Sequence, residues 1–200
     1  MEKIIPTRTQ AFELLKEYNS NASLIRHALA VESVMLHFAK IMGETDREKW
    51  GVIGLIHDLD YERYPESHCR KVREILTARH WPEEYIHAVE SHGWRLCTDV
   101  EPIERMEKAL YTVDELTGLI SAVAILRPSK SILDLSVKSV KKKWKDKSFA
   151  AGTNREEMEK GATEFGVELW AHVDNVIVAM RRIAPQIGLA GNLSPTASDN

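Results

Sequence analysis

The sequence predicts an all-α fold, and three observations lead to this. Apolar residues recur at steps of three and four along most of the chain, which is the period of an amphipathic helix. Prolines and asparagine- or aspartate-containing segments separate these stretches and supply helix caps. The chain shows no convincing strand alternation, no β-hairpin dipeptide and no internal repeat. We therefore expect a compact multi-helix bundle with additional C-terminal helices.

The N-terminal half is predicted to hold five helices. The first covers residues 9–18, and the polar segment 19–21 ends it and caps the next helix, which carries a long apolar stripe as far as Gly43. Asp46 can cap the third helix, which is apolar on nearly every side over residues 50–56 and is expected to be buried. Pro65 and Pro82 each open one further short helix.

The C-terminal half continues the helical pattern. Pro102 precedes a long helix that Pro128 ends, and a lysine-rich segment follows over residues 137–147. Apolar residues then recur over residues 158–183, which predicts one long last helix. We expect a single domain over residues 1–188, with a core at about 20–127 and a helical extension over 131–188, followed by a disordered tail over 189–200.

Composition limits the classes of function. The chain has 27 lysines and arginines against 30 aspartates and glutamates, and its net charge of −3 gives no strong signal for nucleic acid or anionic membrane. The longest apolar stretch, residues 118–126, is about half a membrane span. Cys69 and Cys97 form no C-x-x-C pair and are too few for a disulfide framework, so we expect ordinary buried thiols in a reducing, cytoplasmic compartment.

Six polar residues interrupt the apolar stripes of five separate helices, and they are His27, His57, Asp58, His68, His92 and Asp114. A single histidine on such a stripe is more often a hydrogen-bonded core residue, and one His-Asp pair is a weak signal. A buried ionised carboxylate, however, costs several kcal/mol unless it is paired or coordinated. All six together favour a common partner, and imidazoles and carboxylates are suitable ligands for a divalent metal.

The order of these residues resembles the HD-domain (HDIG-related) family of metal-dependent phosphohydrolases. That family has a histidine, a later His-Asp doublet and a distant aspartate, and its two-metal members add two histidines before the last aspartate. The matching residues here are His27, His57, Asp58, His68, His92 and Asp114. The resemblance covers roughly residues 20–127, and segments 54–62 and 114–118 are similar to an uncharacterised bacterial branch. Tyr61 stands where many relatives have a lysine or a glutamate.

The resemblance implies a phosphohydrolase that cleaves a phosphomonoester or phosphodiester of a small molecule, such as a nucleotide, with a metal-activated water. One or two divalent ions are implied, of iron, manganese, cobalt, nickel or zinc, with magnesium at a weaker single site. The first ion would bind His27, His57, Asp58 and Asp114, and the second would bind His68 and His92 with Asp58 as a bridge. Asp58 would thus be catalytic, and Glu62 or Asp60 would accept a proton.

Several expectations about ligands and partners stay open. Arg26, Lys138 and Lys142 are candidates for phosphate contact, although a lysine run is more often a solvated face. A non-catalytic, metal-supported nucleotide-binding or sensor module is one alternative function, and a purely structural metal site with closed coordination is another. The apolar stripe of the last helix suits packing within the domain or across a homodimer.

Overall fold

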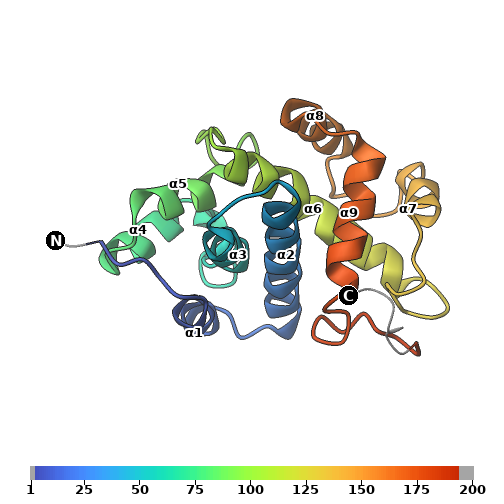
Figure 1. Cartoon of the computed structure of the whole chain (residues 1–200), viewed down its shortest axis with the longest axis horizontal. Helices are drawn as coiled ribbons and strands as arrows, with labels where there is room; N and C mark the ends of the chain where they lie inside the picture. Colours follow the sequence, from blue (N-terminus) through green and yellow to red (C-terminus); the bar gives the residue numbers. More distant parts are fainter. Residues whose placement is uncertain (1–2, 194–200) are drawn as a thin grey trace. The chain divides into compact units, whose positions relative to one another are not determined.

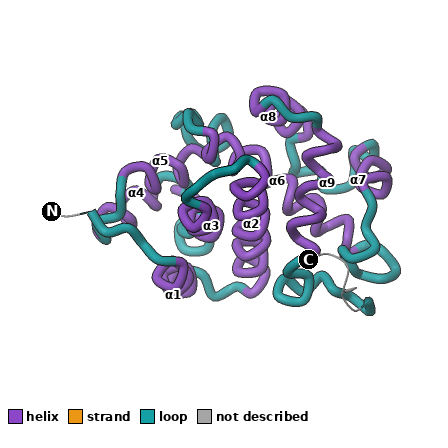
Figure 2. The backbone as a smooth tube through the Cα atoms, viewed as in Figure 1, coloured by secondary structure: helices purple, strands orange, loops and turns teal. Residues whose placement is uncertain are grey.

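The computed structural model describes residues 3–193, and this range is helical without β-strands (Figure 1, Figure 2). Its elements are α1 (Arg8–Tyr18), α2 (Ala22–Ile41), α3 (Arg47–Ile56), the 3-10 turn η1 (Pro65–Ser67), α4 (Lys71–Ala78), α5 (Glu83–Ser91), α6 (Arg105–Ile125), α7 (Val137–Trp144), α8 (Arg155–Phe165) and α9 (Leu169–Arg181). An isolated β-bridge joins Trp94 and Thr98. The predicted all-α class is confirmed.

The chain divides into two compact units, Met1–Tyr111 and Thr112–Asn200. The division falls inside α6, upstream of the break between residues 127 and 131 that the sequence suggested. The first unit contains α1 to α5 and the start of α6, and the second contains the rest of α6 with α7, α8 and α9.

In the first unit, α3 is the central element. It packs against α1, α2 and α5, and α4 packs against α5 (Figure 1). Every residue from Trp50 to Ile56 is buried, as the sequence predicts for a helix that is apolar on all sides. The approach of α3 to α2 depends on two glycines, because a Cβ at Gly51 would lie 2.9 Å from Leu36 Cδ2 and one at Gly54 would lie 2.9 Å from Met35 Cγ. Both glycines therefore bring the helix axes closer than larger residues would allow.

Polar caps set the starts of the first three helices. Thr7 and Gln10 form a reciprocal capping box at α1. Asn21 accepts a hydrogen bond from Ser23 N at α2, and Asp46 accepts one from Lys49 N at α3. These helix starts follow from local side-chain chemistry, and for α2 and α3 they are where the sequence predicts them.

The second unit corrects one predicted helix. The periodic segment over residues 158–183 is not one helix but two, α8 and α9. Gly166 ends α8 in the left-handed conformation, with φ of +80°, and its N–H bonds back to Ala162 O and Thr163 O. A glycine C-cap stops a helix even where the apolar spacing continues beyond it, because only the backbone conformation changes. The helix α9 packs against both α7 and α8.

The predicted tail begins with residues that have defined partners. Leu189 is buried, its carbonyl accepts a 2.8 Å hydrogen bond from Ile132 N, and Asn192 N donates to Ser129 O at 3.2 Å. Residues 194–200 of the predicted tail lie outside the described range. Among the helices of residues 3–193, none combines the length and apolar character needed to cross a membrane.

Candidate metal centre

Five of the six predicted ligands lie in the first unit, and that unit brings them together. His27 comes from α2, one turn before Val31, while His57 is the C-cap of α3 and Asp58 follows it directly. His68 follows η1, and His92 is the C-cap of α5. Residues from four separate segments of the sequence therefore converge on one carboxylate.

The Asp58 carboxylate stands between two pairs of histidines. Its Oδ2 atom lies 3.3 Å from His57 Nε2 and 3.8 Å from His27 Nε2. Its Oδ1 atom lies 3.4 Å from His68 Nε2 and 3.5 Å from His92 Nε2. One oxygen thus faces each pair, which is the arrangement expected of a carboxylate that bridges two cations.

Hydrogen bonds on the far side of three rings orient their nitrogens. His57 Nδ1 donates to Gly54 O at 2.8 Å, His92 Nδ1 donates to Val89 O, and His68 Nδ1 donates to Asp60 Oδ1 at 2.8 Å. Since Nδ1 carries the proton in each bond, the Nε2 lone pair of the neutral ring faces the centre. This is how ligating histidines are usually held in metalloproteins.

Two helix C-termini also end at this centre. The helices α3 and α5 finish at His57 and His92, and the C-terminal end of a helix carries partial negative charge that favours a cation. Burial raises the pKa of the Asp58 carboxyl, but when the rings are protonated the positive charge of His57 and the hydrogen bonds from His57 and His92 outweigh burial and hold that pKa well below its usual range. The Asp58 carboxylate is therefore ionised, and its side chain remains 17% exposed, so solvent reaches it.

Asp60, predicted as a candidate proton acceptor, is fully buried and acts on its neighbours. Its Oδ1 accepts from His68 Nδ1 and Cys69 N, and its Oδ2 accepts from Val72 N at 2.9 Å. Burial lowers the pKa of His68, but the hydrogen bond to Asp60 and the charge of Asp58 outweigh burial and raise it overall. These contacts make Asp60 the group that positions His68.

The same contacts correct the predicted setting of His68. The sequence predicts a helix that Pro65 opens, with His68 on its apolar stripe, but Pro65–Ser67 is a 3-10 turn and α4 begins only at Lys71. Between them, Cys69 has a φ of +66°, which no α-helix accommodates. The Asp60 carboxylate accepts the N–H groups of Cys69 and Val72 and so replaces the acceptors that an earlier helical turn would supply.

Glu62, the other candidate proton acceptor, holds the start of α2. Its carboxylate accepts hydrogen bonds from Ser20 N at 2.8 Å, Asn21 N at 2.9 Å and Ser20 Oγ at 2.7 Å. The hydrogen bond from the Asn21 backbone, together with those from Ser20, lowers the pKa of Glu62. The side chain of Asn19 donates to Leu59 O at 3.0 Å nearby. The turn after the doublet is therefore fastened to the segment before α2, which carries His27.

The remaining predicted site residues have more exposed positions or belong to the second unit. Arg26 is exposed on α2 beside His27. Lys138 and Lys142 are exposed on α7, in the second unit. Asp114 also belongs to the second unit, in its part of α6, where it is partly buried, and burial together with Asp114 raises the pKa of the adjacent Glu115.

Sequence reasoning missed the position of the two cysteines. Cys69 Sγ lies 3.9 Å from His92 Nε2 and 2.7 Å from Cys97 Sγ. The available signal was that Cys69 directly follows a predicted ligand, His68, and Cys97 follows another, His92, by five residues. The sequence predicts only ordinary buried thiols, and in the structure Cys69 is buried while Cys97 is partly buried.

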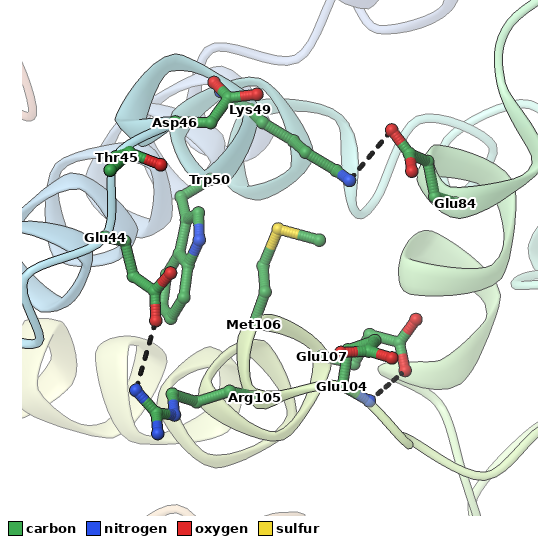
Figure 3. A pocket seen from close by; sticks show the side chains of 10 residues that line it. All are labelled: Glu44, Thr45, Asp46, Lys49, Trp50, Glu84, Glu104, Arg105, Met106 and Glu107. Carbon is green, nitrogen blue, oxygen red and sulfur yellow. Dashed lines mark hydrogen bonds and ion pairs between the residues drawn. The ribbon is translucent and has the colours of Figure 1, made fainter.

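A separate pocket of about 560 Å³ lies in the first unit but contains none of these residues. It is lined by acidic side chains such as Glu44 and Glu84, with Trp50 on its wall (Figure 3). Its two cations are already paired, Lys49 with Glu84 at 2.9 Å and Arg105 with Glu44 at 3.3 Å. This acidic pocket does not suit a phosphorylated substrate.

The donor set fits a divalent metal. One nitrogen each from His27 and His57 and one oxygen of Asp58 lie within 4.8 Å of one another. Lone pairs that converge in this way repel one another unless a cation lies between them, and nitrogen with oxygen donors suits iron, manganese, cobalt, nickel or zinc. The fold and this cluster together define an all-α protein with a histidine–aspartate metal centre.

Comparison with known families leads to the same class. Residues 24–117 match the family model described as HD domain, and this match includes all six predicted ligands. Residues 24–117 therefore form an HD domain. HD domains are in general metal-dependent phosphohydrolases, so a hydrolytic metal centre agrees with the family. No curated protein and no solved structure matches the chain.

Proposed function

We propose that the protein is a metal-dependent phosphohydrolase that cleaves a phosphomonoester or phosphodiester of a small molecule such as a nucleotide. The observation that carries the proposal is the Asp58 carboxylate, whose two oxygens face two separate pairs of histidine Nε2 atoms at 3.3 to 3.8 Å. A structural metal site needs only one closed shell of ligands, whereas this centre offers two adjacent ligand pairs and a partly exposed carboxylate.

His27, His57 and Asp58 would hold the first ion, and His68, His92 and Asp58 the second. We propose Asp114 as the remaining ligand of the first ion, because its distance along the chain from the doublet follows the HD pattern and it falls within the matched range. When bound, such ions polarise a phosphoryl oxygen and make a water nucleophilic at neutral pH.

The chain's own residues orient the ligands and admit the substrate. Gly54 O, Val89 O and the Asp60 carboxylate fix three imidazole rings and keep their Nε2 atoms directed at Asp58. We assign Asp60 and Glu62 to positioning, because both carboxylates are engaged by neighbouring N–H groups. Tyr61 is 46% exposed, and its ring centroid lies 5.1 Å from that of His68 in an edge-on contact, so it is a solvent-exposed neighbour of the second histidine pair.

A substrate phosphate also needs positive charge beside it. Arg26 neighbours His27 on α2 and is exposed, so its flexible side chain is a candidate phosphate contact. Lys138 and Lys142 remain candidates from α7 on the basis of the sequence alone.

The test combines metal analysis with a substrate panel. Purified protein should contain a divalent metal and hydrolyse at least one of a panel of nucleotides, phosphomonoesters and phosphodiesters in the presence of Mn²⁺. Asp58→Asn keeps the shape of the side chain but removes its charge, and it should lower hydrolysis by about 100-fold or more together with the metal content. The matched control is Asp99→Asn, an exposed carboxylate in the loop after the second histidine pair, which should leave both unchanged.

Two outcomes would contradict the enzyme proposal. Wild-type protein that holds metal and binds nucleotides without turnover would instead be a metal-supported sensor module. Wild-type protein whose metal does not exchange, and which binds no phosphorylated compound, would have a structural site.

A further inference from the structure

Two thiols lie beside the second histidine pair. Cys69 Sγ is 2.7 Å from Cys97 Sγ and 3.9 Å from His92 Nε2. Cys69 Sγ and one nitrogen each of His68 and His92 all lie within 4.8 Å of one another, as do ligands around one ion. A disulfide bond is about 2.05 Å long, so the two sulfurs need to approach by less than about 1 Å to form one.

The backbone around the sulfurs is shaped for this contact. A Cβ at Gly93 would collide with both Cys69 Sγ and Cys97 Sγ, so the space next to His92 is occupied by sulfur. Cys69 has a φ of +66°, a conformation that is uncommon for residues other than glycine. Arg70 Nε donates to Cys97 O at 3.3 Å, which ties together the two loops that carry the thiols.

We propose that Cys69 is a third donor for the ion held by His68 and His92, and that a reversible disulfide with Cys97 withdraws this donor. A thiolate is a strong ligand for soft and borderline metals such as zinc and cobalt, whereas a disulfide sulfur carries no negative charge. The ligand role rests on the metal centre proposed above, but the disulfide itself does not. The pair would thus couple the occupancy of the second metal position to the thiol oxidation state.

The oxidation step balances with a peroxide as the oxidant. The two S–H bonds break, the sulfurs form one S–S bond, and the two protons and two electrons pass to hydrogen peroxide, which becomes two water molecules. A dithiol reductant reverses the step by thiol–disulfide exchange.

Peptide mapping tests the disulfide directly. Full-length protein is treated with one equivalent of hydrogen peroxide, its remaining thiols are alkylated, and it is digested with trypsin without reduction. The cysteines lie in the tryptic peptides 64–70 and 96–105, so the expected product is a covalent pair of these peptides that dithiothreitol separates. Alkylation of both thiols in oxidised wild-type protein, or linkage only between two protein molecules, would overturn the proposal.

Cobalt tests the ligand role without any enzyme assay. Reduced full-length protein titrated with Co²⁺ should show a thiolate-to-cobalt charge-transfer band in the near ultraviolet. Oxidised protein should lack the band and bind its second Co²⁺ about 10-fold or more weakly. Reduced Cys97→Ser protein keeps Cys69 and should retain the band, and reduced Cys69→Ser protein should not. Equal cobalt affinity of the reduced and oxidised forms, or a band retained by Cys69→Ser, would overturn the ligand role.

The two readouts separate this inference from the proposed function. If the peptides link but wild-type protein binds no Co²⁺ in either form, the metal centre fails and only the disulfide stands. If Co²⁺ binds tightly to both forms without the band, the metal centre stands and Cys69 is not one of its ligands.

Discussion

At Gly54, α3 packs against backbone atoms of α2, and Gly54→Ala tests whether this contact positions the metal centre. A Cβ at this position would lie 2.9 Å from Met35 Cγ, 3.1 Å from Val31 O and 3.2 Å from Glu32 Cα. Met35 can rotate, but two of these three atoms belong to the α2 backbone. The helices must therefore separate by a few tenths of an ångström.

Two opposing effects determine the change in stability. Overpacking of a close contact costs about 1–3 kcal/mol. Alanine in place of glycine inside a helix contributes up to about 1 kcal/mol in the opposite direction. We expect a net loss of about 1–2 kcal/mol, which for a chain of this length corresponds to a fall in Tm of roughly 2–8 °C.

Gly118→Ala is the matched control. Gly118 also lies inside a helix, α6, but a Cβ there would have no heavy atom within 4 Å. The helix-propensity gain is then unopposed, and we expect a stabilisation of about 0.5–1 kcal/mol. The two substitutions are chemically identical and should have opposite signs.

Thermal unfolding and metal titration together provide the assay. His27 on α2 and His57 after α3 have their Nε2 atoms 3.2 Å apart, so separation of the helices should also weaken metal binding in Gly54→Ala but not in Gly118→Ala. A Gly54→Ala protein that melts at or above the wild-type temperature would refute the packing argument. Unchanged metal affinity in a destabilised variant would refute the link between this packing and the metal centre.

Three further predictions concern buried polar groups. Asp60→Asn should weaken metal binding by the His68 pair about 10- to 100-fold in calorimetric titration, because the His68 ring loses its charged acceptor, and unchanged affinity would contradict that role. Asn19→Ala should lower the free energy of unfolding, measured in urea, by about 1–3 kcal/mol, because the Leu59 carbonyl loses its buried donor. A loss of only about 0.3 kcal/mol would contradict a stabilising role for this hydrogen bond. Burial lowers the pKa of His172 from 6.5 to about 4, so stability is full above pH 6.5 and falls by up to about 3 kcal/mol as the pH drops to 4. His172→Gln should remove that part of the slope in pH-dependent unfolding, and an unaltered slope would show that other groups cause it.

The candidate ligands were predictable from the sequence because these ionisable residues stand in otherwise apolar stretches. Asp58 and His57 end an apolar run whose residues are all buried, and an ionisable pair at the end of such a run requires a partner. The HD pattern then relates the doublet to histidines far along the chain, and the described part of the structure brings His27, His68 and His92 to the same carboxylate.

The roles of Asp60, Glu62 and Cys69 were not predictable in the same way. Cys69 directly follows His68. Asp60 and Glu62 both follow the doublet closely in the sequence, so their positions along the chain made the two carboxylates appear equally suited to proton transfer. The structure distinguishes them, because Asp60 accepts hydrogen bonds from the loop before α4 and Glu62 accepts them from the segment before α2. Such contacts join residues that are up to 42 positions apart, and no local pattern records them.

The all-α class, the starts of α2 and α3 and the six candidate ligands were readable from the amino-acid sequence, because caps, apolar periodicity and ionisable residues on apolar stripes are local properties. Three features required the three-dimensional fold: the apolar segment over residues 158–183 is two helices, Asp58 directs one oxygen at each histidine pair, and two thiols meet beside His92. The first feature depends on the left-handed backbone conformation of Gly166, which the apolar spacing does not record. The other two depend on side-chain orientation across packed segments, which contacts between residues distant in the chain set.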